Sequence, residues 1–273
     1  MNVPSVLHIC FDNSHRLTKR VHLFRYKQHD FKLVQSTNRQ WADHLLTIVN
    51  TEAELDEAFR IAAEFVSALA WETGGRSAVW IAGSTSRRST LRAAKPSIFT
   101  FTRVNPFDRC VGFGLSSLPD VVTHEQRIAL ALFREARAAN SPYQRFLFMW
   151  QVLEVLPGSK GADYVDRTLA LHRPRLRDIE SPLSSLDLSG KSLGNHLWDD
   201  CRSAIAHIRR DPARGATIEF DSSQDQLRID KAGRVIEVFA RDYIEHELGL
   251  TQCVYLKKPA QGGIAEFKSY PGA

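Results

Sequence analysis

The sequence has no long hydrophobic run and only four cysteines. No apolar stretch approaches the roughly 18 residues of a membrane-spanning helix, so we expect no membrane association. The first residues, MNVPSVLHICFDNSH, lack the basic and long apolar parts of a secretory signal. The cysteines are scattered and form no C-x-x-C pair, which is typical of reduced thiols in a cytoplasmic protein. We therefore expect neither a disulfide framework nor a zinc site.

Common cofactor and catalytic motifs are missing as well. The stretch LPGSKG at 156–161 resembles a phosphate-binding loop, but it lacks the leading Gly and the Ser or Thr that should follow the Lys. The sequence contains no G-x-S-x-G, no H-E-x-x-H and no metal-binding cysteine spacing. These absences predict a protein without a metal and without a nucleotide cofactor.

Acidic residues are missing from one segment, residues 74–106. All of its charged residues are basic: Arg76, Arg87, Arg88, Arg92, Lys95 and Arg103. The net charge of the whole chain is +5, so the basic excess is concentrated in this segment. A local excess of this kind is typical of a surface that binds a polyanion such as RNA, and it is also typical of a solvated, Ser-rich loop.

The first part of the chain, residues 1–115, has the pattern of a mixed α+β domain. A helix is predicted at 51–75, where Thr51 and Glu54 form a capping box and apolar residues follow at helical spacing. Short runs with partial alternation predict strands at 6–11, 20–27, 31–36, 45–49, 77–83 and 97–104. No catalytic motif is apparent in this part, and the turn-rich residues 105–120 mark its boundary.

The second part, residues 120–250, is predicted to be a helical bundle with a small β-hairpin, and residues 251–273 form a tail. Helices are predicted at 123–140, 141–158, 161–175, 192–210 and 233–249, and the hairpin at 216–220 and 226–230. The helix at 141–158 begins with Ser141 as cap and Gln144 closing a capping box. Because this helix is apolar almost all round, we expect it at the centre of a bundle or dimer. The fold class is therefore α+β.

The helix at 192–210 contains the sequence RSAIAH, an Arg and a His separated by four residues. Three further R-x4-H pairs occur in the chain, so the spacing alone decides nothing. At about 100° per residue, one face of this helix is polar. That face carries Asp199, Ser203, His207 and Arg210. The opposite face is apolar and should join the core: Leu197, Cys201, Ala204, Ile205 and Ile208. Arg202 lies about 140° from His207 and flanks the polar face.

Arg202 to His207 resembles the R-x4-6-H signature of HEPN domains. These are all-helical modules of prokaryotic toxins, defence systems and nucleotide-handling proteins, and many are metal-independent ribonucleases that work as dimers. Active members often have Asn, Asp or His after the Arg, where this chain has Ser203. The apolar SPYQRFLFMWQVLE segment together with RSAIAH also resembles MauJ-type methylamine-utilisation proteins.

The HEPN resemblance implies a metal-independent endoribonuclease acting in defence or as a toxin, with RNA as its partner. In this interpretation His207 transfers the proton, Arg202 stabilises the phosphorane, and Ser203 and Asp199 orient these groups. The RNA backbone would be held by five arginines: Arg209, Arg210, Arg87, Arg88 and Arg92. The helical half would form a homodimer that supplies a second His, and a regulatory protein is a further expected partner.

Three alternatives stay open. The helical half could be a non-catalytic module that binds RNA, a nucleotide or a protein. The whole chain could be an accessory factor of a metabolic operon, as the MauJ resemblance implies. His207 and the two arginines that follow it could also be purely structural, because cations near a helix C-terminus interact favourably with the helix dipole.

Overall fold

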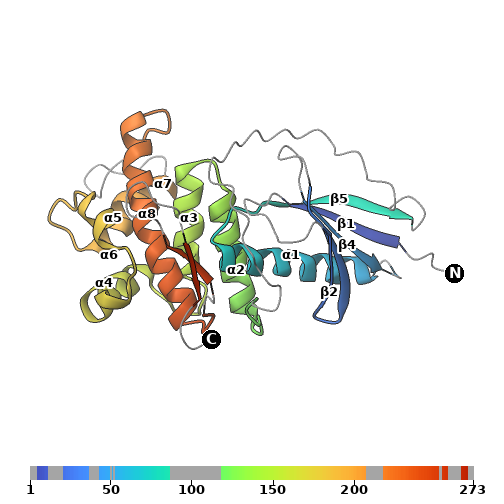
Figure 1. Ribbon diagram of the computed structural model, residues 1–273. Coiled ribbons are helices and arrows are strands. Elements are labelled where there is room, and N and C mark those ends of the chain that lie inside the picture. Colours follow the sequence, from blue (N-terminus) through green and yellow to red (C-terminus); the bar gives the residue numbers. More distant parts are fainter. Residues whose placement is uncertain are drawn as a thin grey trace. The chain divides into compact units, whose positions relative to one another are not determined.

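The computed structural model describes residues 5–11, 21–36, 43–49, 51, 53–86, 118–206, 218–251, 254–257 and 266–269. The chain divides into two compact units, Met1–Pro119 with Gln252–Ala273 and Asp120–Thr251. The first unit contains an antiparallel sheet with a helix, and the second is helical (Figure 1). The predicted α+β class is confirmed.

The sheet of the first unit has five strands in the order β2-β3-β4-β1-β5, and all neighbouring pairs are antiparallel. The strands are β1 (Ser5–Phe11), β2 (Val21–Tyr26), β3 (His29–Val34), β4 (Asp43–Val49) and β5 (Val79–Ser86). A two-residue turn joins β2 to β3. Its residues, Lys27 and Gln28, both have positive φ angles, as a tight hairpin turn requires. The predicted strands from 6 to 83 are confirmed, while 97–104 lies outside the described residues.

Helix α1 (Ala53–Thr73) packs on one face of this sheet (Figure 1). Leu7, Ile9 and Phe11 of β1 are buried in the core that the sheet forms with α1. Because side chains alternate between the two faces of a strand, His8 and Cys10 lie on the opposite face. The sequence pattern of β1 therefore assigns one face to the core and leaves the other to polar and sulfur-bearing side chains.

A second, two-stranded sheet follows the helical unit in the chain. Strands β6 (Val254–Lys257) and β7 (Glu266–Ser269) pair antiparallel, and β6 contacts α1. These residues, which the sequence suggested were a separate tail, thus group with the first unit.

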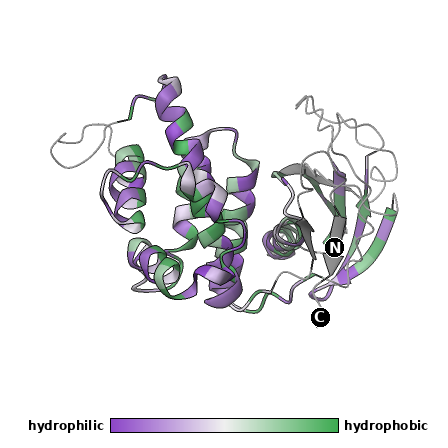
Figure 2. Cartoon of the chain, turned by 60° about the vertical axis from the view of Figure 1, so that its left-hand side comes forward, coloured by the Kyte–Doolittle hydropathy of each residue, from purple (hydrophilic) through white to green (hydrophobic). Residues whose placement is uncertain are grey.

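The second unit is built around α3 (Pro142–Val152), which packs against both α2 (His124–Ala138) and α8 (Ser223–His246). Phe146, Met149 and Trp150 of α3 are fully buried, which confirms the prediction of a central apolar helix. Figure 2 shows that helices of this unit carry both hydrophobic and hydrophilic residues, as packed helices with one solvated face do.

The helix starts were predicted with mixed success. Thr123 and Gln126 form the complete capping box of α2. Ser141 precedes α3 as predicted, but its side chain makes no capping hydrogen bond, so the box with Gln144 is wrong. The other helical segments are α4 (Gly161–His172), η2 (Arg173–Arg175), α5 (Glu180–Ser184), α6 (Leu193–His196), η3 (Leu197–Ser203) and α7 (Ala204–Ala206). No described helix is both long and apolar enough to cross a membrane.

The small β-hairpin predicted at 216–220 and 226–230 is wrong, because residues 223–246 form the single helix α8. Ser222 is the N-cap of this helix, and its hydroxyl accepts a hydrogen bond from the backbone N–H of Asp225 at 3.3 Å. Buried residues then recur at helical spacing: Ile229, Ala232, Val235, Ile236 and Phe239. The short run QLRID belongs to the first turns of this long amphipathic helix, with Gln226 and Leu227 exposed and Ile229 buried.

Candidate functional site

The segment that carries RSAIAH is not the single α-helix that the sequence predicts. The described part consists of α6, the π-helical turn η3 and α7, which follow one another from Leu193 to Ala206. A π-helix closes its hydrogen bonds between residues five apart, so side chains rotate less per residue than in an α-helix. Asp199, Arg202 and Ser203 all belong to this π-helical turn.

The predicted polar face is only partly present. Asp199 is half-buried, but Ser203 is 6% exposed and lies among the buried residues of η3. The polar stripe was therefore wrong for Ser203, because the π-helical winding shifts the face that the 100° rule assigns. The predicted apolar side is confirmed by the burial of Leu197, Cys201, Ala204 and Ile205.

Arg202 is held against an aromatic ring. Its guanidinium carbon lies 4.7 Å from the ring centroid of Trp198, a cation–π geometry. Trp198 is 36% exposed, and its ring lies 5.7 Å from that of buried Trp150 in α3. The central helix thus supports Trp198, and Trp198 supports the half-buried Arg202.

A buried ion cluster is centred on Asp200 of the turn η3, and no sequence pattern had predicted it. The carboxylate of Asp200 accepts hydrogen bonds from Lys191 Nζ at 2.7 and 2.9 Å and lies 3.2 Å from His196 Nδ1. Arg228 of α8 donates to the Asp200 backbone carbonyl at 3.0 Å. Burial lowers the pKa of His196, although Asp200 acts in the opposite direction, so His196 is neutral at neutral pH. The spacing of His196 and Asp200, four residues apart on a helix, was the signal available in the sequence.

Cys201, the thiol nearest to this cluster, is fully buried. Desolvation raises the pKa of Cys201 to about 12, so the sulfur is protonated at neutral pH and is a poor nucleophile. The thiol therefore contributes to packing and not to the chemistry of this site.

The other predicted site residues lie outside the described residues. They are His207, Arg209, Arg210, Arg87, Arg88 and Arg92. Of the predicted catalytic and RNA-binding sets, the structure therefore places Arg202, Ser203 and Asp199, and it brings these three together on one turn.

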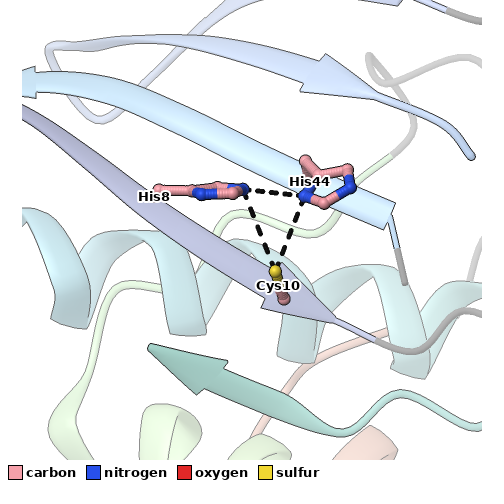
Figure 3. Close-up of side chains that lie close together, drawn as sticks. All are labelled: His8, Cys10 and His44. Atoms are coloured by element: carbon pink, nitrogen blue, oxygen red, sulfur yellow. Dashed lines mark hydrogen bonds between the residues drawn. The ribbon is translucent and has the colours of Figure 1, made fainter. Parts of the chain in front are cut away.

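A second cluster of reactive side chains lies in the first unit, where the sequence shows no catalytic motif. His8 Nε2 lies 2.7 Å from His44 Nδ1, and the sulfur of Cys10 lies 3.8 and 3.5 Å from these nitrogens (Figure 3). Among the residues that the structure describes, this is the one group of three side chains placed to hold a metal ion. The signal in the sequence was the His-x-Cys alternation within a strand.

Burial sets the protonation of this cluster. It raises the pKa of Cys10 to about 11, so the thiol is protonated at neutral pH. Burial also lowers the pKa of His8 and, together with the neighbouring His8, that of His44. Both imidazoles are therefore neutral at neutral pH, the form in which histidine binds metal ions.

Comparison with known families gives a match in the helical unit. Residues 129–245, which run from α2 to the last turn of α8, match the family described as methylamine utilization protein MauJ. Neither a curated protein nor a solved structure matches the chain. The predicted resemblance to MauJ-type proteins is thus confirmed for most of the helical unit.

Proposed function

We propose that the protein is a non-catalytic accessory factor of a methylamine-utilisation-type metabolic system and that residues 120–251 are its binding module. The match of residues 129–245 to the MauJ family carries this proposal. The matched stretch includes the central helix α3, the turn η3 and nearly all of α8. In this proposal the protein works in the cytoplasm, in keeping with its scattered cysteines.

The surroundings of Arg202 support a binding role. The Trp198 ring covers one face of the guanidinium, and this contact leaves the in-plane N–H groups as the donors for a ligand. Such a planar fork matches a carboxylate or a phosphate. We therefore expect the module to bind an anionic ligand or an acidic segment of a partner protein through Arg202.

The surroundings of the motif also argue against a covalent mechanism in which a serine or cysteine of this turn attacks the substrate. Ser203 is buried, and Cys201 is a protonated, fully buried thiol. Neither side chain can attack a bound substrate from these positions. The described part of the motif thus offers a fixed cation and no exposed nucleophile.

The metabolic role is tested by deleting the gene in its own organism. We expect slower growth with methylamine as the sole nitrogen source and unchanged growth with ammonium. Wild type should restore growth, Arg202→Ala should not, and Arg234→Ala should, because Arg234 is an exposed arginine of α8 in a surface ion pair. Equal growth of the deletion strain and the parent on methylamine would refute the proposal.

A metal-independent endoribonuclease is the second candidate, and the π-helical turn η3 favours it. π-Helical turns are rare in proteins, and those that occur often lie at functional sites. This turn contains Asp199, Arg202 and Ser203 and lies four residues before His207. In this candidate His207 transfers the proton, Arg202 stabilises the transition state, and a homodimer brings two motifs to one RNA.

One assay separates the two candidates. Purified wild type, His207→Ala and His172→Ala are incubated with cellular RNA in excess EDTA, and the fragment ends are analysed. His172 is a matched control because it closes another R-x4-H pair and is exposed at the end of α4. We expect no cleavage by any of the three. Fragments with 2′,3′-cyclic phosphate from wild type and His172→Ala, absent with His207→Ala, would establish the ribonuclease instead.

A further inference from the structure

We propose that His8, Cys10 and His44 bind one transition-metal ion, with Zn²⁺ as the best-fitting ion, on the face of the sheet opposite α1. This site belongs to the first unit and is independent of the function proposed for the helical unit. Figure 3 shows the three side chains projecting toward one another from β1 and β4.

The backbone of the sheet brings these residues together. His8 and Cys10 are two residues apart on β1, so their side chains lie on the same face. Cys10 is directly opposite His44 in the antiparallel pairing of β1 with β4. Side chains opposite each other in such a pair have Cβ atoms about 5 Å apart, within reach of a shared ion. Strand register therefore places the three side chains next to one another on one face of the sheet.

The distances between the donor atoms fit a tetrahedral ion. With Zn–N bonds of about 2.0–2.1 Å and Zn–S bonds of about 2.3 Å, a nitrogen and a sulfur on one ion are about 3.6 Å apart, and two nitrogens are about 3.3 Å apart. The observed N···S distances are 3.5 and 3.8 Å. The two nitrogens, now 2.7 Å apart, must separate by roughly 0.6 Å, which a small rotation of one ring provides.

Each proton that occupies a donor atom of the site has a place to go when the ion binds. At 2.7 Å, one of the two facing ring nitrogens donates a hydrogen bond to the other. When the ion binds, this proton moves through solvent to the other nitrogen of the same neutral ring, which leaves both facing nitrogens free to coordinate. The thiol proton of Cys10 leaves to solvent as the sulfur coordinates. No oxidation or reduction is involved.

The donor set and its burial select the kind of ion. Two imidazoles and a thiolate favour Zn²⁺ or copper over Mg²⁺ and Ca²⁺, which prefer oxygen ligands. His8 and Cys10 are 8% and 6% exposed, whereas His44 is partly exposed and provides the access route. No described residue adds a fourth donor to the group. The fourth position of a tetrahedral ion would thus be taken by water or a small ligand, as in open zinc sites.

Cobalt titration of the full-length protein tests the proposal. The protein is freed of metal with a chelator and titrated with Co²⁺, which substitutes for Zn²⁺ and reports its ligands by absorption. We expect one equivalent to produce a thiolate-to-cobalt charge-transfer band and the visible bands of a four-coordinate ion, and Zn²⁺ to abolish both. His44→Ala should weaken binding by about a hundredfold or more, since even residues that only support a ligand cost 10–100-fold.

Matched cysteine variants identify the sulfur. Cys10→Ala should remove the charge-transfer band, whereas Cys201→Ala, which alters the buried cysteine of the helical unit, should leave it unchanged. Circular dichroism of each variant checks folding, and His44→Ala changes a partly exposed side chain, so its result stands if Cys10→Ala misfolds. Absence of a cobalt spectrum in wild type overturns the proposal. A spectrum that persists in both His44→Ala and folded Cys10→Ala also overturns it, because the ion would then be bound elsewhere.

Discussion

Glu237 illustrates at the residue scale how the helical unit keeps a largely buried carboxylate charged. It lies on α8, where its Oε1 accepts hydrogen bonds from Arg137 of α2 and Arg241 of α8, both at 3.0 Å. Burial alone would raise the pKa of Glu237, but the two guanidiniums outweigh it and lower the pKa to about 2. The same residue thus links α2 to α8 through one ion pair between helices.

We predict that Glu237→Gln destabilises the protein at pH 7 by roughly 1–3 kcal/mol, because it removes a charge-assisted hydrogen-bond acceptor from two arginines. The pKa of Glu237 is lower in the folded state than in the unfolded state. Its contribution is therefore fully present above about pH 4.5, the ordinary value, and is lost as the pH falls toward 2. Urea unfolding of wild type and variant between pH 7 and pH 2.5 measures this difference.

Glu125→Gln is the control for this series, since Glu125 is a partly exposed carboxylate in the first turn of α2. It should change the free energy of unfolding by no more than a few tenths of a kcal/mol. If the difference in the free energy of unfolding between wild type and Glu237→Gln stayed constant down to pH 2.5, the charge of the carboxylate would contribute nothing to stability.

At the scale of the elements, close backbone contact holds α6 against α4. The Gly194 N–H donates to Asp166 Oδ1 at 2.7 Å, and Ser192, the N-cap of α6, donates to the other carboxylate oxygen at 2.7 Å. A Cβ on Gly194 would lie 2.3 Å from the carbonyl oxygen of Ala162 in α4. Only a glycine permits this approach of the two backbones. Because η3 follows α6 directly, the contact also helps to position η3.

We predict opposite effects for two Gly→Ala substitutions in the helical unit. Gly194→Ala should destabilise the protein by about 1–3 kcal/mol, because backbone must move to relieve the clash with Ala162. Gly233→Ala in α8 should stabilise it by about 0.5–1 kcal/mol, because a Cβ there meets nothing within 4 Å and alanine favours the helix. Thermal and urea unfolding measure both. Equal shifts in one direction would contradict the packing argument.

The elements also show what the sequence could and could not predict. Alternation and capping patterns correctly predicted β1, α1 and α2, since these signals lie within a few consecutive residues. The π-helical winding of η3 was missed, as were the contacts of Trp198 with Trp150 and of Asp200 with Lys191, which lie outside any short window. The predicted hairpin failed because a short apolar run cannot distinguish a strand from the start of a helix.

The two candidate sites differ in the same way. Arg202 and Ser203 were predicted because a local motif names them, and Asp199 because of its helical spacing from Ser203. The group of His8, Cys10 and His44 was missed because its members meet only through strand register, and the predicted strand began at residue 45, one residue after His44. A search for metal ligands by local spacing overlooks ligands that alternate on one strand and pair with the next.

At the scale of the whole molecule, the first unit is built from both ends of the chain. After the helical unit ends at Thr251, strand β6 contacts α1, and the two strands β6 and β7 pair with each other. The helical unit is therefore an insertion between two parts of the first unit, and α1 receives contacts from both ends of the sequence.

This arrangement predicts that deleting residues 252–273 weakens the first unit and spares the second. Without β6, the part of α1 that this strand contacts is exposed, and local opening of α1, β1 and β4 becomes less costly. We expect a loss of about 1 kcal/mol or more, which corresponds to a roughly fivefold or larger fall in amide-exchange protection. Hydrogen exchange read by mass spectrometry resolves the two units, and amides of α3 and α8 serve as the internal control. Equal loss in α1 and α8 would mean that the two units unfold together, and unchanged protection in α1 would mean that β6 contributes nothing to its stability.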